Sequence, residues 1–273
     1  MKMKLYINSE LEISRYSFAD SRVRKDIRLA VLADLHNCMC EDGGRKLFSI
    51  IDGEKPDAVL FAGDMIDALE DADPFPAFEF FRLLHSHYPV IYGMGNHERK
   101  ILEGYRMERE RRIVKTGLKS SGLKILSNSY KYLGDTGIKV SCLDLPLSYF
   151  SRFEHPELKE KQIIESLGEI DRSVYNIMIA HDPQFFETYS DYGPDLVLSG
   201  HMHGGVIRLP YLGGLVSPKL KLFPKYDAGL FKRKGSTMIV SRGLGMHSIL
   251  VRVNNPTELV ILDIKKKDGK APS

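Results

Sequence analysis

The sequence predicts an α/β fold in which two stacked sheets are covered by helices on their outer faces. Three observations lead to this prediction. Short, uninterrupted apolar runs recur up to residue 201, which is typical of strands that are buried on both faces. Amphipathic or charged segments lie between these runs, as expected for helices that cover a sheet. Toward the C-terminus, short strand-like runs separated by glycine and proline replace this alternation.

Five apolar runs are the predicted strands. Each is rich in Val, Ile, Leu or aromatic residues, and each ends in a polar cluster. They cover residues 27–34, 57–64, 89–96, 174–182 and 195–201. A hairpin is expected over 131–146, and further short strands are expected after residue 205.

Four segments between the strands are the predicted helices. They cover residues 43–56, 75–89, 98–121 and 156–170. The first stops before Pro56, and the second has prolines at its start. The third is highly charged, with opposite charges three or four residues apart, which favours one exposed helix rather than a nucleic-acid-binding patch.

The composition excludes several classes of protein. The hydrophobic fraction of 43% and the charged fraction of 27% are ordinary globular values, so a disordered or fibrous chain is excluded. No apolar run approaches the length of a membrane span, and the first twenty residues lack the apolar stretch of a signal peptide. We therefore expect a cytoplasmic protein or one peripheral to the membrane. The net charge of +3 is too small to indicate nucleic-acid binding by itself.

We expect one domain over residues 1–273, with a frayed tail from about residue 265. The three cysteines, Cys38, Cys40 and Cys142, favour a reducing compartment because their number is odd and no signal peptide is visible. A structural zinc site at Cys38 and Cys40 would need two further ligands nearby, so two semi-buried thiols are the simpler interpretation.

Polar clusters follow the five predicted strands, and they combine carboxylate, amide and imidazole groups. They are Asp34 with His36, Asp64, Asn96 with His97 and Glu98, His181 with Asp182, and His201 with His203. Sites form where strand ends converge in α/β sheets. This mixture of ligand types suits Mn²⁺, Fe²⁺ or Zn²⁺. A core of unpaired Asp and His at five strand ends would be very costly without metal.

The ordered set D-x-H, G-D, G-N-H-E, H and G-H-x-H over residues 34–203 resembles the calcineurin-like metallophosphoesterase superfamily. Downstream, GHMHGGVIRLPYLGGLVSPKLKLFPKYDAGLF and VSRGLG resemble its bacterial branch of membrane-associated phosphodiesterases and pyrophosphohydrolases. The resemblance implies the metallo-dependent phosphatase fold, a four-layer α/β/β/α sandwich of two mixed sheets. It also implies two divalent ions, with Mn²⁺ favoured over Fe²⁺ or Zn²⁺. One ion would be held by Asp34, His36 and His203, the other by Asn96, His181 and His201, and Asp64 would bridge them.

The resemblance further implies hydrolysis of a phosphodiester or pyrophosphate bond by a hydroxide held between the ions. His97 would protonate the leaving group or act as its electrostatic partner. Asp67 would orient His97, although a helix N-cap is the alternative role for Asp67. Ala68 stands where the superfamily's protein phosphatases carry a phosphate-binding arginine, which argues against a phosphoprotein substrate.

The segment 208–235 is basic and carries interleaved aromatic residues. One interpretation is a cationic, partly apolar lip for a phosphorylated small molecule, for a lipid-linked or nucleotide-linked substrate, or for a bilayer surface. The other is a solvated loop whose aromatic side chains pack on the sheet. Arg208 in this segment and Arg242 in SRGLG are candidate substrate contacts. A non-catalytic scaffold with the same fold, a nuclease of the same superfamily, and a basic nucleic-acid-binding protein are the alternative functions.

Overall fold

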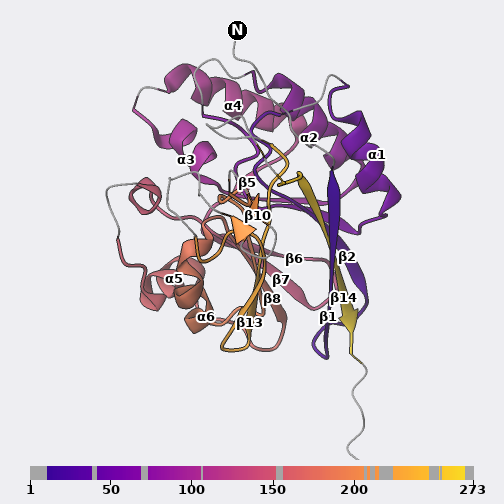
Figure 1. Cartoon of the computed structure of the whole chain (residues 1–273), viewed down its shortest axis with the longest axis vertical. Coiled ribbons are helices and arrows are strands. Elements are labelled where there is room, and N and C mark those ends of the chain that lie inside the picture. The colour runs from indigo at the N-terminus through magenta and orange to yellow at the C-terminus, as the bar shows by residue number, and fades with distance from the viewer. Residues whose placement is uncertain are drawn as a thin grey trace, which may run out of the picture.

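The fold is described from a computed structural model, which covers residues 11–38, 42–68, 73–105, 107–151, 156–205, 208–209, 213–214, 224–245, 252 and 254–267. In this part of the chain, two mixed six-stranded sheets pack face to face. Helices α1 to α4 gather on one side of the pair, and α5 and α6 on the other (Figure 1). The predicted fold class, a four-layer α/β/β/α sandwich, is confirmed.

The first sheet carries the polar clusters of the N-terminal half. Strands β2, β3, β4 and β5 are parallel, because a helical connection separates each from the next. In spatial order the strands are β1 (Glu12–Asp20), β14 (Glu258–Lys266), β2 (Ile27–Leu32), β3 (Ala58–Phe61), β4 (Val90–Gly93) and β5 (Ile125–Leu126).

The second sheet carries the histidine clusters of the C-terminal half. Its four central strands are parallel, and antiparallel partners lie at both edges. In spatial order they are β12 (Gly229–Arg233), β13 (Ser236–Val240), β9 (Leu196–Ser199), β8 (Tyr175–Ala180), β7 (Ile138–Leu143) and β6 (Ser129–Tyr132). The pair β6–β7 is the hairpin expected over 131–146. A short ladder of β10 (Arg208–Leu209) and β11 (Gly213–Gly214) lies apart from both sheets.

Three apolar layers hold the sandwich together. Val, Ile and Leu side chains from both sheets meet between them, and each outer face is covered by the apolar side of its own helices. The helices are α1 (Arg45–Gly53), α2 (Phe75–His87), α3 (Asn96–Glu103), α4 (Glu108–Ser121), α5 (Glu160–Leu167) and α6 (Phe186–Tyr192), with short 3₁₀ turns η1 (Leu147–Phe150) and η2 (Pro183–Phe185). None of the helices in the described ranges is long and apolar enough to cross a bilayer.

The prediction of one helix over 98–121 is wrong, because α3 and α4 are separate helices. The chain leaves the helical conformation at Gly104, which is extended with φ −62° and ψ 135°. A Cβ at this position would lie 2.3 Å from the carbonyl oxygen of Lys100. The charge spacing continues across the break, so it did not reveal where α3 ends.

Strand β1 was not predicted, and it changes the description of the C-terminal tail. It pairs in parallel with β14 over nine residues, from Glu12 opposite Glu258 to Asp20 opposite Lys266. Strand β14 therefore extends to Lys266, whereas fraying was expected to begin at about residue 265. The last part of that predicted tail, residues 268–273, lies outside the described residues.

Arg22 joins the two sheets at the edge where β1 ends. Its guanidinium donates to both Asp20 carboxylate oxygens at 2.8 Å and to Asp195 Oδ1, just before β9, at 2.7 Å. It also donates to the carbonyl oxygen of Val174, just before β8, at 3.1 Å. The hydrogen bonds from Arg22 lower the pKa of Asp20.

Replacing Arg22 by glutamine is expected to lower the free energy of unfolding by about 1–2 kcal/mol at pH 7. This value is smaller than for a fully buried ion pair, because the side chains of Arg22 and Asp20 are partly exposed. The pKa of Asp20 is lowered in the folded state. This stabilisation is therefore fully present above the pKa of Asp20 in the unfolded chain, about 3.9, and is lost as the pH falls through its pKa in the folded protein. Urea unfolding of both proteins between pH 7 and pH 3 measures the difference.

The matched control is Arg24→Gln, since Arg24 forms an exposed ion pair with Asp135. Exposed pairs contribute about 0–1 kcal/mol, so this variant should stay close to the parent protein. A difference for Arg22→Gln that is as large at pH 3 as at pH 7 would contradict the assignment.

Candidate metal centre

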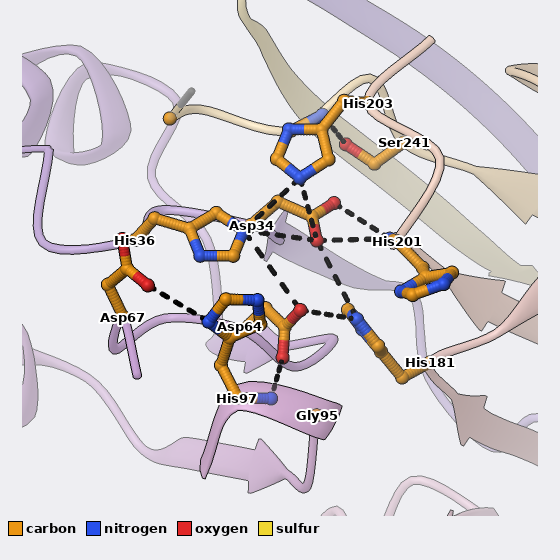
Figure 2. Close-up of polar contacts among 12 residues, drawn as sticks. Asp34, His36, Asp64, Asp67, Gly95, His97, His181, His201, His203 and Ser241 are labelled. Carbon is orange, nitrogen blue, oxygen red and sulfur yellow. Dashed lines mark hydrogen bonds and ion pairs between the residues drawn. The ribbon is translucent and has the colours of Figure 1, made fainter. Parts of the chain in front are cut away.

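The candidate ligands lie where the parallel strands of both sheets end. Asp34 follows β2, Asp64 follows β3, and Asn96 begins the helix after β4. His181 directly follows β8, and His201 follows β9. These ends meet across the interface between the sheets, because the His181 Nδ1 atom lies 2.7 Å from the carbonyl oxygen of Ala62. Side chains far apart in sequence are thereby brought into one buried cluster (Figure 2).

Five of the seven candidate ligands have left-handed backbone conformations, which residues other than glycine rarely adopt. They are Asp34 (φ 51°), His36 (φ 48°), Asp64 (φ 52°), His201 (φ 68°) and His203 (φ 50°). Backbone hydrogen bonds between neighbouring loops hold this arrangement, including one from the amide of Asp34 to the carbonyl oxygen of Gly63 at 3.0 Å. Conformations of this kind cluster at functional sites, where the surrounding structure maintains them.

Three overlapping groups of potential ligand atoms lie side by side, and in each the ligand atoms lie within 4.8 Å of one another. The first is Asp34, His36 and His203, and the second is Asp64, His181 and His201. The third, His36, Asp64 and His97, takes one residue from each of the other two. In the first group the Nε2 atoms of His36 and His203 are 3.1 Å apart. In the second, His181 Nε2 lies 2.9 Å from Asp64 Oδ2.

The first two groups adjoin through their carboxylates. His36 Nε2 lies 4.0 Å from Asp34 Oδ1 and 4.0 Å from Asp64 Oδ2. His181 Nε2 lies 3.7 Å from Asp34 Oδ1, in addition to its contact with Asp64. Asp64 therefore faces a histidine of each of these two groups.

The donor set fits divalent transition metals. It offers carboxylate oxygens and imidazole nitrogens in a buried place, which suits Mn²⁺, Fe²⁺ or Zn²⁺. The side-chain oxygen of Asn96 is buried and has no hydrogen-bond donor. A buried acceptor in this state is costly unless a ligand satisfies it. The Nδ1–H of His181 donates to Ala62, which leaves Nε2 as the ring nitrogen available to a metal ion.

The charges in the cluster are strongly coupled. Burial raises the pKa of Asp34, and the neighbouring Asp64 raises it further. Burial opposes ionisation of Asp64 as well, but His181 and His97 outweigh it and bring the pKa of Asp64 well below its ordinary value. Burial disfavours the charged form of His181, but Asp64 outweighs burial and raises its pKa. A divalent cation would replace the histidine protons as the partner of both carboxylates.

His97 and Asp67 form the pair that the sequence suggested. His97 Nδ1 lies 3.0 Å from Asp67 Oδ1, and the His97 ring lies edge-on to the ring of His36 at 4.6 Å. Burial lowers the pKa of His97, but Asp64 and Asp67 outweigh burial, so the net shift is upward. The alternative role of Asp67, capping α2, is not observed, because the N-cap of α2 is Pro74.

Glu98 has a structural role that the sequence analysis missed. Its buried carboxylate accepts hydrogen bonds from the amides of Asp64 (2.9 Å), Ile66 (2.9 Å) and Gly95 (3.1 Å) and from the Tyr92 hydroxyl (2.7 Å). It thus joins the loop after β3 to the start of α3. Its position three residues after Gly95, at the third residue of the helix, was the available signal.

The described part of the basic segment 208–235 is largely ion-paired. Arg208 binds Asp227 at 2.9 Å, Lys225 binds Glu187 at 2.5 Å, and Arg233 and Lys234 both bind Asp191. The aromatic rings of Tyr226, Phe231 and Phe186 pack edge to face. This part matches the interpretation of a loop whose aromatic residues pack on the fold. Tyr211, Lys219, Lys221 and Phe223 lie outside the described residues.

The remaining candidates are distributed as follows. Arg242 binds Glu12 and Glu258, each at 3.1 Å, and its contact with substrate stays a prediction, as does that of Arg208. Arg252, which the sequence analysis did not single out, lies beside His203. Neither Cys38 nor Cys142 takes part in a disulfide bond within the described part of the chain. Within the described residues Cys38 belongs to no potential metal-binding group, and Cys40 lies outside them.

Replacing Glu98 by glutamine is expected to lower the free energy of unfolding of the chelator-treated protein by about 2–3 kcal/mol, because an amide group would face several N–H donors in a buried place. Tyr92→Phe removes one of the four donors and should cost about 1 kcal/mol. Urea unfolding measures both. An Glu98→Gln variant as stable as the parent would exclude this anchoring role.

Comparisons with known proteins agree with the site. The family model described as Calcineurin-like phosphoesterase matches residues 27–205. The metallophosphoesterase YkuE of Bacillus subtilis is 26% identical over 79% of this chain and 70% of its own length. The metallophosphoesterase Cj0846 of Campylobacter jejuni is 27% identical over 96% of this chain, which spans 66% of that relative. The phosphodiesterase YaeI of Escherichia coli is 26% identical over 77% of this chain and 71% of its own.

Among solved structures, a 5′-nucleotidase precursor from Thermus thermophilus matches with a TM-score of 0.47 and 15% identity. The match covers 81% of this chain and 49% of that one.

Proposed function

Because the chain belongs to the calcineurin-like phosphoesterase family, we propose that it is a dinuclear metal-dependent phosphoesterase that hydrolyses a phosphodiester or pyrophosphate bond. The observation that carries the proposal is the adjacency of two ligand groups. Asp64 contacts His181 of one group and approaches His36 of the other. Two ions so placed can act together on the oxygens of an in-line displacement at phosphorus.

The proposed ligand set uses the residues of both groups and the free amide oxygen. One ion is assigned to Asp34, His36 and His203, the other to Asn96, His181 and His201, and Asp64 is the bridging carboxylate. We favour Mn²⁺, with Fe²⁺ or Zn²⁺ as the alternatives. Bound ions would supply a hydroxide near neutral pH and stabilise charge on the phosphoryl oxygens.

The chain's own contribution to proton transfer is assigned to His97. Its Nδ1 atom lies 3.0 Å from Asp67 Oδ1 and accepts a hydrogen bond from the amide of Ala68 at 3.1 Å. These contacts hold the ring so that Nε2 is the nitrogen that would give a proton to the leaving oxygen. Ala68 follows Asp67, where a phosphate-binding arginine would be expected in a protein phosphatase. We therefore favour a phosphorylated small molecule or a lipid-linked substrate over a phosphoprotein.

The alternatives predict different observations. A non-catalytic scaffold would be expected to have lost ligands, whereas every position of the pattern carries a competent side chain. A nuclease of the same superfamily would use the same catalytic set, so only its substrate would distinguish it. That one relative is named a phosphodiesterase supports phosphodiester chemistry.

Hydrolysis of bis-p-nitrophenyl phosphate tests the proposal. The chelator-treated protein should be inactive, and Mn²⁺ should restore turnover more fully than Zn²⁺, Fe²⁺ or Mg²⁺. Asp64→Ala should abolish metal-supported turnover with an unchanged circular dichroism spectrum, because it removes the bridging ligand. His97→Ala should lower kcat about 10²- to 10⁴-fold, the usual contribution of a general acid.

His85→Ala is the matched control, since His85 is an exposed histidine on α2, and it should retain full activity. Elemental analysis should find two metal ions per chain in the parent protein and fewer in Asp64→Ala. Turnover that survives complete chelation, or an Asp64→Ala variant with parental activity, would refute the proposal.

A further inference from the structure

Arg252 is a buried cation that the proposed mechanism does not use. Its residue exposure is only 8%. One terminal nitrogen, Nη2, donates to the carbonyl oxygen of Gly245 and makes a long contact of 3.4 Å with that of Gly243. The Nε and Nη1 atoms are buried and have no hydrogen-bond partner. Three of the five N–H donors of this guanidinium therefore lack an acceptor.

The lack of partners distinguishes Arg252 from other buried or half-buried arginines nearby. Arg242 binds two carboxylates, and Arg208 binds Asp227. Within the described residues, no carboxylate lies within ion-pair distance of Arg252. Burial lowers the pKa of Arg252 to about 10, and the negative charge of Asp34 opposes this effect, so the side chain is still cationic at neutral pH. A buried cation without an anion is unfavourable unless a ligand supplies one.

Arg252 lies beside His203, which belongs to the first ligand group of the candidate metal centre. Its Nη2 atom lies 3.5 Å from Nδ1 of His203. The other ring nitrogen of His203, Nε2, faces the first ligand group, 3.1 Å from His36 and 3.7 Å from Asp34. Since the two ring nitrogens of an imidazole point away from each other, the His203 ring stands between the guanidinium and that group.

We propose that Arg252 binds a second negatively charged group of the substrate, a phosphate or carboxylate that lies outside the metal cluster behind His203. This inference rests on the proposed function, because it takes the reacting phosphoryl group to lie at the cluster. A guanidinium is suited to such a group, since its planar donors match two oxygens of a phosphate or carboxylate. Arg252 would then select substrates that carry two anionic groups over those that carry one.

A pair of probes that differ by one phosphate tests this selection. Isothermal titration calorimetry on the Mn²⁺-loaded protein compares thymidine 5′-monophosphate with thymidine 3′,5′-bisphosphate. The parent protein should bind the bisphosphate about 10- to 100-fold more tightly, the usual effect of hydrogen bonds between charged groups. Arg252→Met should lose this advantage and keep the affinity for the monophosphate.

The same comparison applies to turnover. The p-nitrophenyl ester of thymidine 5′-phosphate, with and without a 3′-phosphate, should show a kcat/KM preference for the bisphosphate in the parent protein and none in Arg252→Met. Arg82→Met is the matched control, because Arg82 is an exposed arginine that pairs with Glu79 on α2. It should retain both the affinity ratio and the kcat/KM ratio.

Thermal unfolding separates binding from a structural role. Arg252→Met should unfold at the same temperature as the parent protein or higher, because it removes a buried unpaired charge. A lower unfolding temperature with an unchanged affinity ratio would overturn the inference, as would a parent protein that does not prefer the bisphosphate. If the ratio depends on Arg252 but neither ester is hydrolysed, the anion site stands and the proposed function fails. If both esters are hydrolysed without preference, only this inference fails.

Discussion

Two buried carboxylates, Asp34 and Asp64, constrain the loops at the carboxyl ends of the parallel strands. Neither is more than 1% exposed, and burial together with the charge of Asp64 raises the pKa of Asp34. His36, which follows β2, and His181, which follows β8, approach both carboxylates, and each histidine compensates their charge only when it is protonated. A divalent cation would compensate the same carboxylates without any bound proton, which is consistent with imidazole and carboxylate groups gathered in one buried place.

The loops that carry these side chains are held by groups without a role in the chemistry. Glu98 fixes the amides of the loop after β3. Asn255, which is fully buried, donates to the carbonyl oxygens of His203 at 2.6 Å and Gly205 at 2.7 Å. Such support is necessary because five of the candidate ligands have left-handed backbone conformations, which an unsupported loop would leave. The centre thus depends on hydrogen bonds outside it as much as on its own side chains.

The sequence was informative wherever a pattern is local. The apolar runs of β2, β3, β4, β8 and β9, and the polar clusters after them, lie within a few residues of each other, so strands and candidate ligands were both predictable. The break at Gly104 was locally encoded but obscured by a continuous charge pattern. The pairing of β1 with β14 joins the two ends of the chain, and no local signal specifies a partner so distant. That residues 1–273 form one domain stays a prediction.

Arg252 shows the same limit at the level of a single side chain. In sequence it is one arginine between two valines, with no neighbouring motif. Its burial and its lack of an anion arise only when the segments around residues 203 and 243 close around it. Residues 208 and 242 were better candidates by sequence because basic and glycine-rich segments surround them. In the structure both of these arginines pair with carboxylates. In the sequence, those carboxylates lie far from the arginines or look no different from surface charges.

The two sheets are joined differently at the two ends of their strands, and this difference bears on function. At one end, Arg22 links the last residue of β1 to the starts of β8 and β9, and the charges there compensate each other within the protein. At the other end, β2, β3, β8 and β9 are linked by the candidate ligand cluster, where buried carboxylates and histidines lie close to the unpartnered N–H groups of Arg252. Binding of ions and substrate there would stabilise the folded state alone. The fold can therefore maintain a costly, strained site at one end because the apolar layers and the Arg22 network hold the sheets together independently of it.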